Sequence, residues 1–193
     1  MRDFVKQQLS ESAEVKRNTA EELSDKIVEA AELLIRSYHN GGKALLIGNG
    51  GSAADAQHIA AELVGRFKME RQAIPAMALT TNTSVLTALG NDYGYDSVFA
   101  RSLEAFAVAG KDTLVAISTS GVSPNILRAA AVAKSLGVKV IALTGKDGGK
   151  LKEIADVALI VPSHDTQRIQ EAHITIGHIL CDLMERSLCE KTG

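Results

Sequence analysis

From Lys43 onward, short and continuously apolar runs alternate with longer segments of helical periodicity. The apolar runs are 44–47, 77–79, 113–117, 138–143 and 157–161, and the segments between them are 52–67, 84–89, 98–107 and 124–136. Continuous apolar runs are typical of strands that are buried on both faces, which occurs when helices cover both sides of a parallel sheet. The alternation therefore predicts an α/β domain built on a mostly parallel, five-stranded sheet flanked by helices.

Both ends of the chain have long helical patterns. No glycine occurs before Gly41, and Ser24 is placed to cap a helix whose apolar residues recur at helical spacing as far as Tyr38. Residues 166–188 form a second long amphipathic pattern without an interior proline. Because no linker or internal repeat divides the chain, we expect an N-terminal helical arm (1–40) and an α/β domain (41–193) that together form one structural unit.

Composition and charge narrow the class of protein. The chain has 193 residues, of which 46% are hydrophobic and 23% charged, so it can bury one sizeable core. A formal net charge of -2 offers no electrostatic case for broad nucleic-acid binding. The opening segment lacks the apolar stretch of a secretory signal, and every apolar run is too short for a membrane helix. We therefore expect a cytoplasmic protein that binds neither nucleic acid nor a membrane.

Two loops that follow predicted strands could bind an anionic ligand. The first (48–52) reads Gly-Asn-Gly-Gly-Ser, and the second (118–124) reads Ser-Thr-Ser-Gly-Val-Ser-Pro; each leads into a helix. Backbone N–H groups at a helix N-terminus, together with hydroxyls, can hold a phosphate without lysine or arginine. Both loops could instead be ordinary turns with capping serines. Neither matches a nucleotide motif, because Ala53 replaces the third glycine of GxGxxG and no Gly-Lys pair precedes Ser or Thr.

The helix after the first loop carries chemically reactive side chains along one face. His58, Glu62 and Arg66 are spaced four residues apart and so form one stripe. A histidine with a glutamate one turn later can present two ligands to an ion such as Zn²⁺, or can serve as an acid/base pair. The alternative is a solvated helix face with a Glu62–Arg66 ion pair.

The last helix contains further polar candidates but its periodicity does not choose among them. Either Gln170 or Glu171 can lie on the same face as His178. His173 points away from His178 by roughly 140° of helical rotation, which favours a structural role for it. A histidine in this partly apolar helix could equally be a core residue with a satisfied hydrogen bond.

These loops and helices resemble the corresponding segments of the bacterial phosphoheptose isomerases. The matching motifs are GNGGSAADAQHIAAEL (48–63), GNDYG (90–94), ISTSG (117–121), LTGKDGG (143–149) and RIQEAH (168–173). The resemblance runs from the helical arm to the last helix. It implies a single sugar-isomerase (SIS) domain with a flavodoxin-like, three-layer fold. It also implies an aldose–ketose isomerase that converts sedoheptulose 7-phosphate to D-glycero-D-manno-heptose 7-phosphate, the first step towards ADP- and GDP-heptose precursors of glycans such as lipopolysaccharide.

The resemblance further implies a homotetramer with active sites shared between subunits, and one zinc ion per subunit. The implied zinc ligands are His58, Glu62, Gln170 and His178. The implied substrate-binding residues are Asn49, Gly50, Gly51, Glu62, Asn91, Asp92, Ser118, Thr119, Ser120, Ser123 and Gln170. As a mechanistic hypothesis, Glu62 moves the carbon-bound proton and His178 serves the oxygens.

One alternative comes from a related, non-catalytic branch of the same fold, which binds a protein partner in the regulation of replication initiation. That branch lacks the equivalents of the Glu62 carboxylate and of the second histidine. This chain has both, which favours the enzyme.

Overall fold

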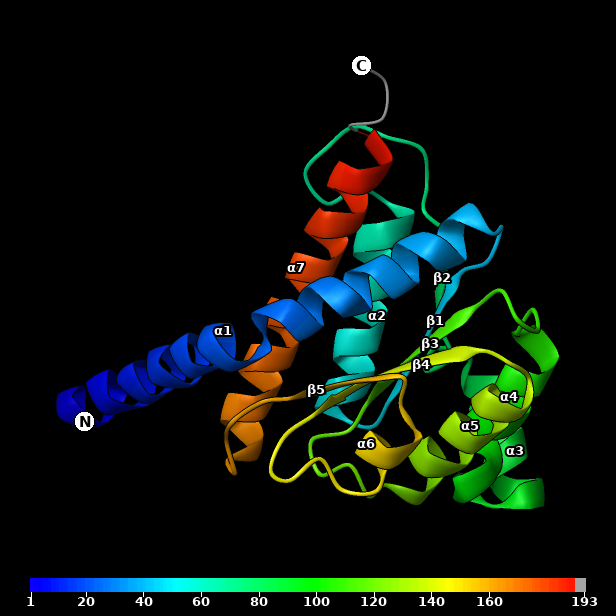
Figure 1. Ribbon diagram of the computed structural model, residues 1–193. Helices are drawn as coiled ribbons and strands as arrows, with labels where there is room; N and C mark the ends of the chain where they lie inside the picture. Colours follow the sequence, from blue (N-terminus) through cyan, green and yellow to red (C-terminus); the bar gives the residue numbers. More distant parts are fainter. Residues whose placement is uncertain (190–193) are drawn as a thin grey trace.

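The computed structural model describes residues 1–189 and contains a five-stranded sheet whose strands all run parallel (Figure 1). The strands are β1 (Ala44–Gly48), β2 (Ala76–Ala78), β3 (Thr113–Ile117), β4 (Lys139–Thr144) and β5 (Val157–Ile160). Their order is β2-β1-β3-β4-β5, which is the flavodoxin-like arrangement. The prediction from the apolar runs is confirmed, and the sheet is wholly rather than mostly parallel.

Helices cover both faces of this sheet. They are α1 (Arg2–His39), α2 (Gly51–Val64), α3 (Thr83–Tyr93), α4 (Val98–Phe106), α5 (Pro124–Ser135), α6 (Leu151–Ile154) and α7 (Thr166–Cys189), with a 3-10 helix η1 (Tyr95–Ser97) between α3 and α4. Helices α1, α2 and α7 pack on one face, and α4, α5 and α6 pack on the other (Figure 1). The result is the expected three-layer arrangement.

The core is divided between the two faces because successive strand residues point in opposite directions. In β1, Leu46 joins the cluster under α1, α2 and α7, whereas Leu45 and Ile47 join the cluster under α4 and α5. All five residues of β1 and of β3 are buried. Burial on both faces explains why these strands have no polar alternation.

The position of the site follows from how the chain leaves β1 and β3. These strands are neighbours, with Gly48 opposite Ile117 at their carboxyl ends. The chain leaves β1 into α2 on one face of the sheet and leaves β3 into α5 on the other face. Such a divergence opens a crevice beyond the strand ends, where ligands of open α/β sheets bind.

Helix α1 differs from the sequence prediction in one detail. It is continuous from Arg2 to His39, and Ser24 lies inside it with its Oγ donating to the backbone oxygen of Ala20. The predicted cap at Ser24 is therefore wrong, because no glycine or proline interrupts the helix before that residue. The second half of α1 contributes Leu23, Ile27 and other residues to the core. The boundary near residue 40 between arm and domain stays a prediction.

None of the helices formed by residues 1–189 is long and apolar enough to cross a membrane. The cytoplasmic location expected from the sequence stays a prediction.

Candidate active site

The two glycine- and serine-containing loops lie side by side, since they follow the adjacent strands β1 and β3. Gly50 is the N-cap residue of α2, and Ser123 is the N-cap residue of α5. The free N–H groups of both helix N-termini therefore point toward the same crevice, where they favour an anion.

The second loop is held in shape by its own hydroxyls and by a close approach of another loop. Ser118 Oγ and Ser123 Oγ are 3.1 Å apart and share a hydrogen bond. Gly121 has a φ of +65°, and a side chain there would collide with the backbone oxygen of Gly148. Only glycine fits this position, so the loop that follows β4 packs directly against the serine loop.

Beside the loops, α2 and α7 bring three potential metal ligands together. His58 Nε2 lies 2.9 Å from His178 Nε2 and 3.2 Å from Glu62 Oε1. One ligand atom from each of the three residues falls within 4.8 Å of the other two. Imidazole nitrogens and a carboxylate oxygen are a donor set that suits Zn²⁺. The chemistry and the proximity of the three side chains thus fit a zinc ion.

The structure also decides between Gln170 and Glu171, a choice that the helical periodicity left open. Gln170 faces the N-terminus of α2: a Cβ atom at Gly51 would come 2.7 Å from its amide nitrogen. Glu171 instead forms an ion pair with Arg168, at 3.2 Å. Gln170 is therefore the residue of α7 that borders the first loop.

Arg66 and His173 lie outside the cluster. Arg66 pairs with Glu70 at 3.8 Å, so the alternative Glu62–Arg66 ion pair is not the arrangement found. His173 is completely buried, and its Nε2 lies 3.0 Å from the backbone oxygen of Thr144. Burial lowers the pKa of His173 to about 4, despite the opposing hydrogen bond to Thr144. This neutral core residue confirms the structural interpretation from the sequence.

Comparisons with known proteins agree with this geometry. The SIS domain family matches residues 7–145, which include both loops, His58 and Glu62. A phosphoheptose isomerase of Citrifermentans bemidjiense is 57% identical over 97% of both chains, and one of Aquifex aeolicus is 54% identical over the full length of both. The chain belongs to the phosphoheptose isomerases. These full-length relatives do not favour the non-catalytic alternative.

Solved phosphoheptose isomerase structures share the whole fold. The one from Neisseria gonorrhoeae has a TM-score of 0.90 and 46% identity, covering 95% of this chain and 98% of that chain. The one from Francisella tularensis has a TM-score of 0.92 and 41% identity, with 95% and 97% covered. The similarity thus includes α7, which lies beyond the matched SIS domain and carries Gln170 and His178.

The sequence analysis missed two residues that contact Asn49 in the candidate site, Asn125 and Tyr95. Asn49 Nδ2 donates to Asn125 Oδ1 at 3.0 Å, and Asn125 Nδ2 donates back to Asn49 Oδ1 at 2.9 Å. The Tyr95 hydroxyl also donates to Asn49 Oδ1, at 3.1 Å. These contacts join segments 46 and 76 residues away from Asn49, and no local spacing signals them.

Asn91 and Asp92 lie at the exposed C-terminal end of α3, a few residues before Tyr95. Among the residues the structure describes, their side chains hydrogen-bond to each other, with Asn91 Nδ2 donating to Asp92 Oδ1 at 2.7 Å. Tyr95, which follows them closely, links this segment to the first loop through its hydrogen bond to Asn49. Within residues 1–189, the side chains of Asn91 and Asp92 form no hydrogen bond with either loop.

Asp55 is a further acidic residue of α2 and lies about one turn before His58. Burial raises the pKa of the Asp55 carboxyl to about 6, although the nearby His58 pulls it in the opposite direction. Its Oδ2 atom is buried and has no hydrogen-bond partner within residues 1–189. Partial burial of Asp55 thus disfavours the charged form of this one carboxyl.

Proposed function

We propose that this chain interconverts sedoheptulose 7-phosphate and D-glycero-D-manno-heptose 7-phosphate at the crevice beyond β1 and β3. The observation that carries the proposal is the cluster of His58, Glu62 and His178, together with two helix N-termini that follow the adjacent strands β1 and β3 and can accept an anion. A phosphate at one end of the substrate and a proton-transfer site at the other are what an aldose–ketose isomerisation of a sugar phosphate needs. The reaction supplies heptose for ADP- and GDP-heptose precursors.

Binding of the phosphate is assigned to the loop between β3 and α5. Ser118, Thr119, Ser120 and Ser123 supply hydroxyl donors, and the first turn of α5 supplies backbone N–H groups. The remaining proposed sugar contacts come from the first loop, α2 and α7 (Asn49, Gly50, Gly51, Glu62 and Gln170) and from the end of α3 (Asn91 and Asp92). This arrangement orients C1 and C2 of the sugar toward Glu62 and His178.

Glu62 and His178 are proposed to move the protons. The Glu62 carboxylate takes a proton from C1 of the ketose, and the C1–H electron pair forms the C1–C2 double bond of an enediol. His178 gives a proton to the C2 oxygen and takes one from the C1 oxygen. Glu62 then returns its proton to C2, so the enzyme ends in its starting protonation state.

His58, Glu62, Gln170 and His178 are proposed to hold one zinc ion per subunit. The three residues of the cluster offer suitable donor atoms. Gln170 is included because its amide lies next to Gly51, at the start of the helix that carries His58 and Glu62. When bound, zinc acts as a Lewis acid that polarises a carbonyl oxygen.

The zinc proposal predicts about one zinc per chain in protein purified without chelator, measured by elemental analysis. His178→Ala is expected to lower zinc affinity by at least about tenfold, because it removes a ligand. His164→Ala is the matched control, since His164 lies in the loop before α7, away from the cluster. Equal zinc affinity in the wild type and the His178 variant would contradict the assignment.

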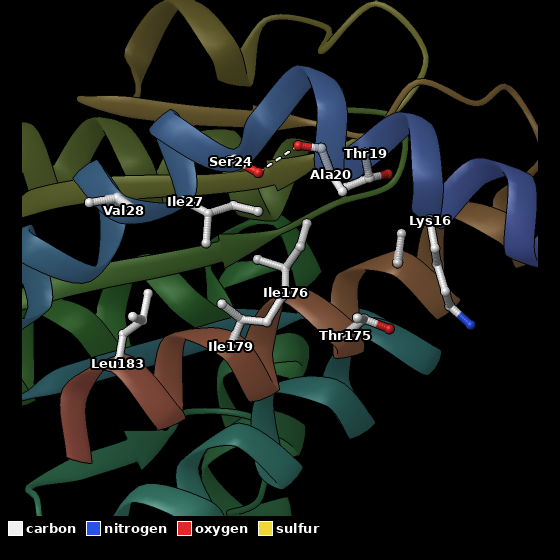
Figure 2. Close-up of a pocket in the computed structure, with 11 residues that line it drawn as sticks. Lys16, Thr19, Ala20, Ser24, Ile27, Val28, Thr175, Ile176, Ile179 and Leu183 are labelled. Carbon is white, nitrogen blue, oxygen red and sulfur yellow. Dashed lines mark hydrogen bonds between the residues drawn. The ribbon is translucent and has the colours of Figure 1, made fainter. Parts of the chain in front are cut away.

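We further propose a homotetramer with shared active sites, supported by two uncovered apolar surfaces. An apolar groove runs between α1 and α7, lined by Ile27, Ile176 and Leu183 and by the exposed Val28 and Ile179 (Figure 2). The first half of α1 extends away from the domain (Figure 1) and exposes Phe4, Val5 and Leu9. Large exposed apolar surfaces of this kind are typical of protein interfaces.

Light scattering coupled to gel filtration tests the oligomer, with an expected mass of four times the 20.4 kDa chain. Ile179→Glu places a charge in the groove and is expected to yield smaller species. Val108→Glu is the matched control, because Val108 is similarly exposed but lies in the loop after α4. A monomeric wild type, or a tetramer unaffected by Ile179→Glu, would contradict the proposal.

Incubation with sedoheptulose 7-phosphate tests the activity directly. Proton NMR is expected to show a new aldose anomeric signal, and in deuterated water the product is expected to carry deuterium at C2 if the proton exchanges on Glu62. A purified, folded tetramer that leaves the ketose unchanged would refute the function.

A further inference from the structure

Residues 65–75 connect α2 to β2, and part of this segment is hydrogen-bonded to one carboxylate of α7, that of Glu185. The backbone N–H groups of Phe67, Lys68 and Met69 donate to the two oxygens of Glu185, at 2.7, 2.8 and 3.1 Å. Glu185 is completely buried. Three consecutive N–H groups on one carboxylate fix the course of the backbone at these residues.

Arg71 also binds Glu185, and it links this carboxylate to the end of α2. Its Nε donates to Glu185 Oε1 at 2.9 Å, and its side chain is 5% exposed. Its terminal nitrogens donate to the backbone oxygens of Glu62 (2.8 Å), Leu63 (2.8 Å) and Gly65 (3.0 Å). Arg71 therefore satisfies carbonyl groups that the end of α2 leaves without helical partners. We call Arg71 and Glu185 the clasp.

The clasp places the ring of Phe67 against His178. The two rings stack with their centroids 5.4 Å apart and their planes at 23°. Lys68, the next residue, binds Asp182 of α7 at 2.7 Å and lies 5.2 Å from the Phe67 ring centroid. Phe67 is half-buried, so its ring packs on α7 while remaining at the border of the site.

Ring stacking and one hydrogen bond are the contacts that the structure gives for the His178 ring within residues 1–189. The hydrogen bond joins its Nε2 to His58. A metal-ligating histidine is usually oriented by a carboxylate or carbonyl on its second nitrogen, and the outer torsion of histidine is broad without such a constraint. The flat face of Phe67 occupies one side of the ring, and His58 lies on another at a centroid distance of 5.0 Å.

We propose that Phe67 is a positioning residue: held by the clasp, its ring fixes the orientation of His178 and thereby the direction in which Nε2 points. The inference rests on the proposed role of His178. It predicts that the aromatic ring, rather than apolar volume alone, is required at position 67.

The test compares Phe67→Leu, which keeps apolar bulk, with Phe67→Tyr, which keeps the ring. Phe106→Leu is the matched control, because Phe106 is an exposed phenylalanine on α4. Phe67→Leu is expected to lower kcat and zinc affinity by about tenfold, the size of effect seen for residues that orient metal ligands. KM and the melting temperature are expected to stay near those of wild type, and Phe67→Tyr is expected to recover both kcat and zinc affinity.

Wild-type kcat and zinc affinity in Phe67→Leu would overturn the inference, as would equal losses in the Leu and Tyr variants. His178→Ala is measured in parallel to separate this failure from that of the proposed function. If His178→Ala turns over the sugar normally, the role of His178 fails and the inference with it. If His178→Ala is inactive and Phe67→Leu is normal, only the inference fails.

Discussion

Glu62→Gln is expected to lower kcat for sedoheptulose 7-phosphate by about 100-fold or more, the lower end of what positioned acid–base groups contribute. Glutamine keeps the size of the side chain and one oxygen atom that can bind a metal ion, but it cannot act as a base toward a carbon-bound proton. The Glu62 carboxylate lies 3.2 Å from His58 Nε2 and is 26% exposed, so it is already placed at the proposed reacting centre. KM should change much less than kcat, since phosphate binding is assigned to the loop after β3.

Glu70→Gln provides the control for this substitution. Glu70 is a glutamate eight positions further along the chain, 91% exposed and paired only loosely with Arg66, at 3.8 Å. It should have wild-type kcat. Zinc content must be measured for both variants, because Glu62 is also a proposed ligand. A Glu62→Gln enzyme with full zinc and near-normal kcat would rule out Glu62 as the base.

Glu185→Ala is expected to destabilise the protein by about 3–5 kcal/mol, the cost typical of breaking a buried ion pair by removing one partner. The substitution leaves the nearly buried guanidinium of Arg71 without its carboxylate and three backbone N–H groups without an acceptor. Folded proteins have total free energies of unfolding of about 5–15 kcal/mol, so the expected loss is a large fraction of the total stability. Urea unfolding at a fixed protein concentration measures it.

The pH dependence of unfolding gives a second measure of Glu185. Burial alone would raise the pKa of its carboxyl, but the N–H groups of Lys68, Phe67 and Met69 and the charge of Arg71 together hold that pKa below its ordinary value of 4.5. Its stabilising contribution is therefore present above pH 4.5 and is lost as the pH falls further. Glu185→Ala should lack this component of the acid-induced loss of stability.

Glu32→Ala is the matched control for Glu185→Ala. Glu32 also pairs with an arginine, Arg36, at 3.2 Å, but both side chains are more than half exposed on α1. Exposed pairs one helical turn apart contribute only about 0.5 kcal/mol or less. If Glu185→Ala lowers the free energy of unfolding as little as Glu32→Ala does, the clasp does not stabilise the protein.

Several features could be predicted from the sequence because their signals are local. The apolar runs identified all five strands. In the inner strands β1 and β3, burial on both faces explains the lack of polar residues. The loops 48–52 and 118–124 were found from glycines and hydroxyls that directly follow strands. The helical spacing of His58 and Glu62 predicted that they share a face, and the resemblance to the phosphoheptose isomerases added residues of α7.

Only the tertiary structure decided how distant elements meet. Periodicity could not separate Gln170 from Glu171, because both lie within reach of the same helix face; the packing of α7 on α2 turned Gln170 toward Gly51. The contacts of Asn49 with Tyr95 and Asn125, and of Phe67 with His178, join segments far apart in the chain. Local sequence thus determined the strands, the loops and the chemistry that each helix offers. The partner of each side chain depended on the angle and register of helix packing, which arise from many weak contacts across the core and leave no periodic signal in the sequence.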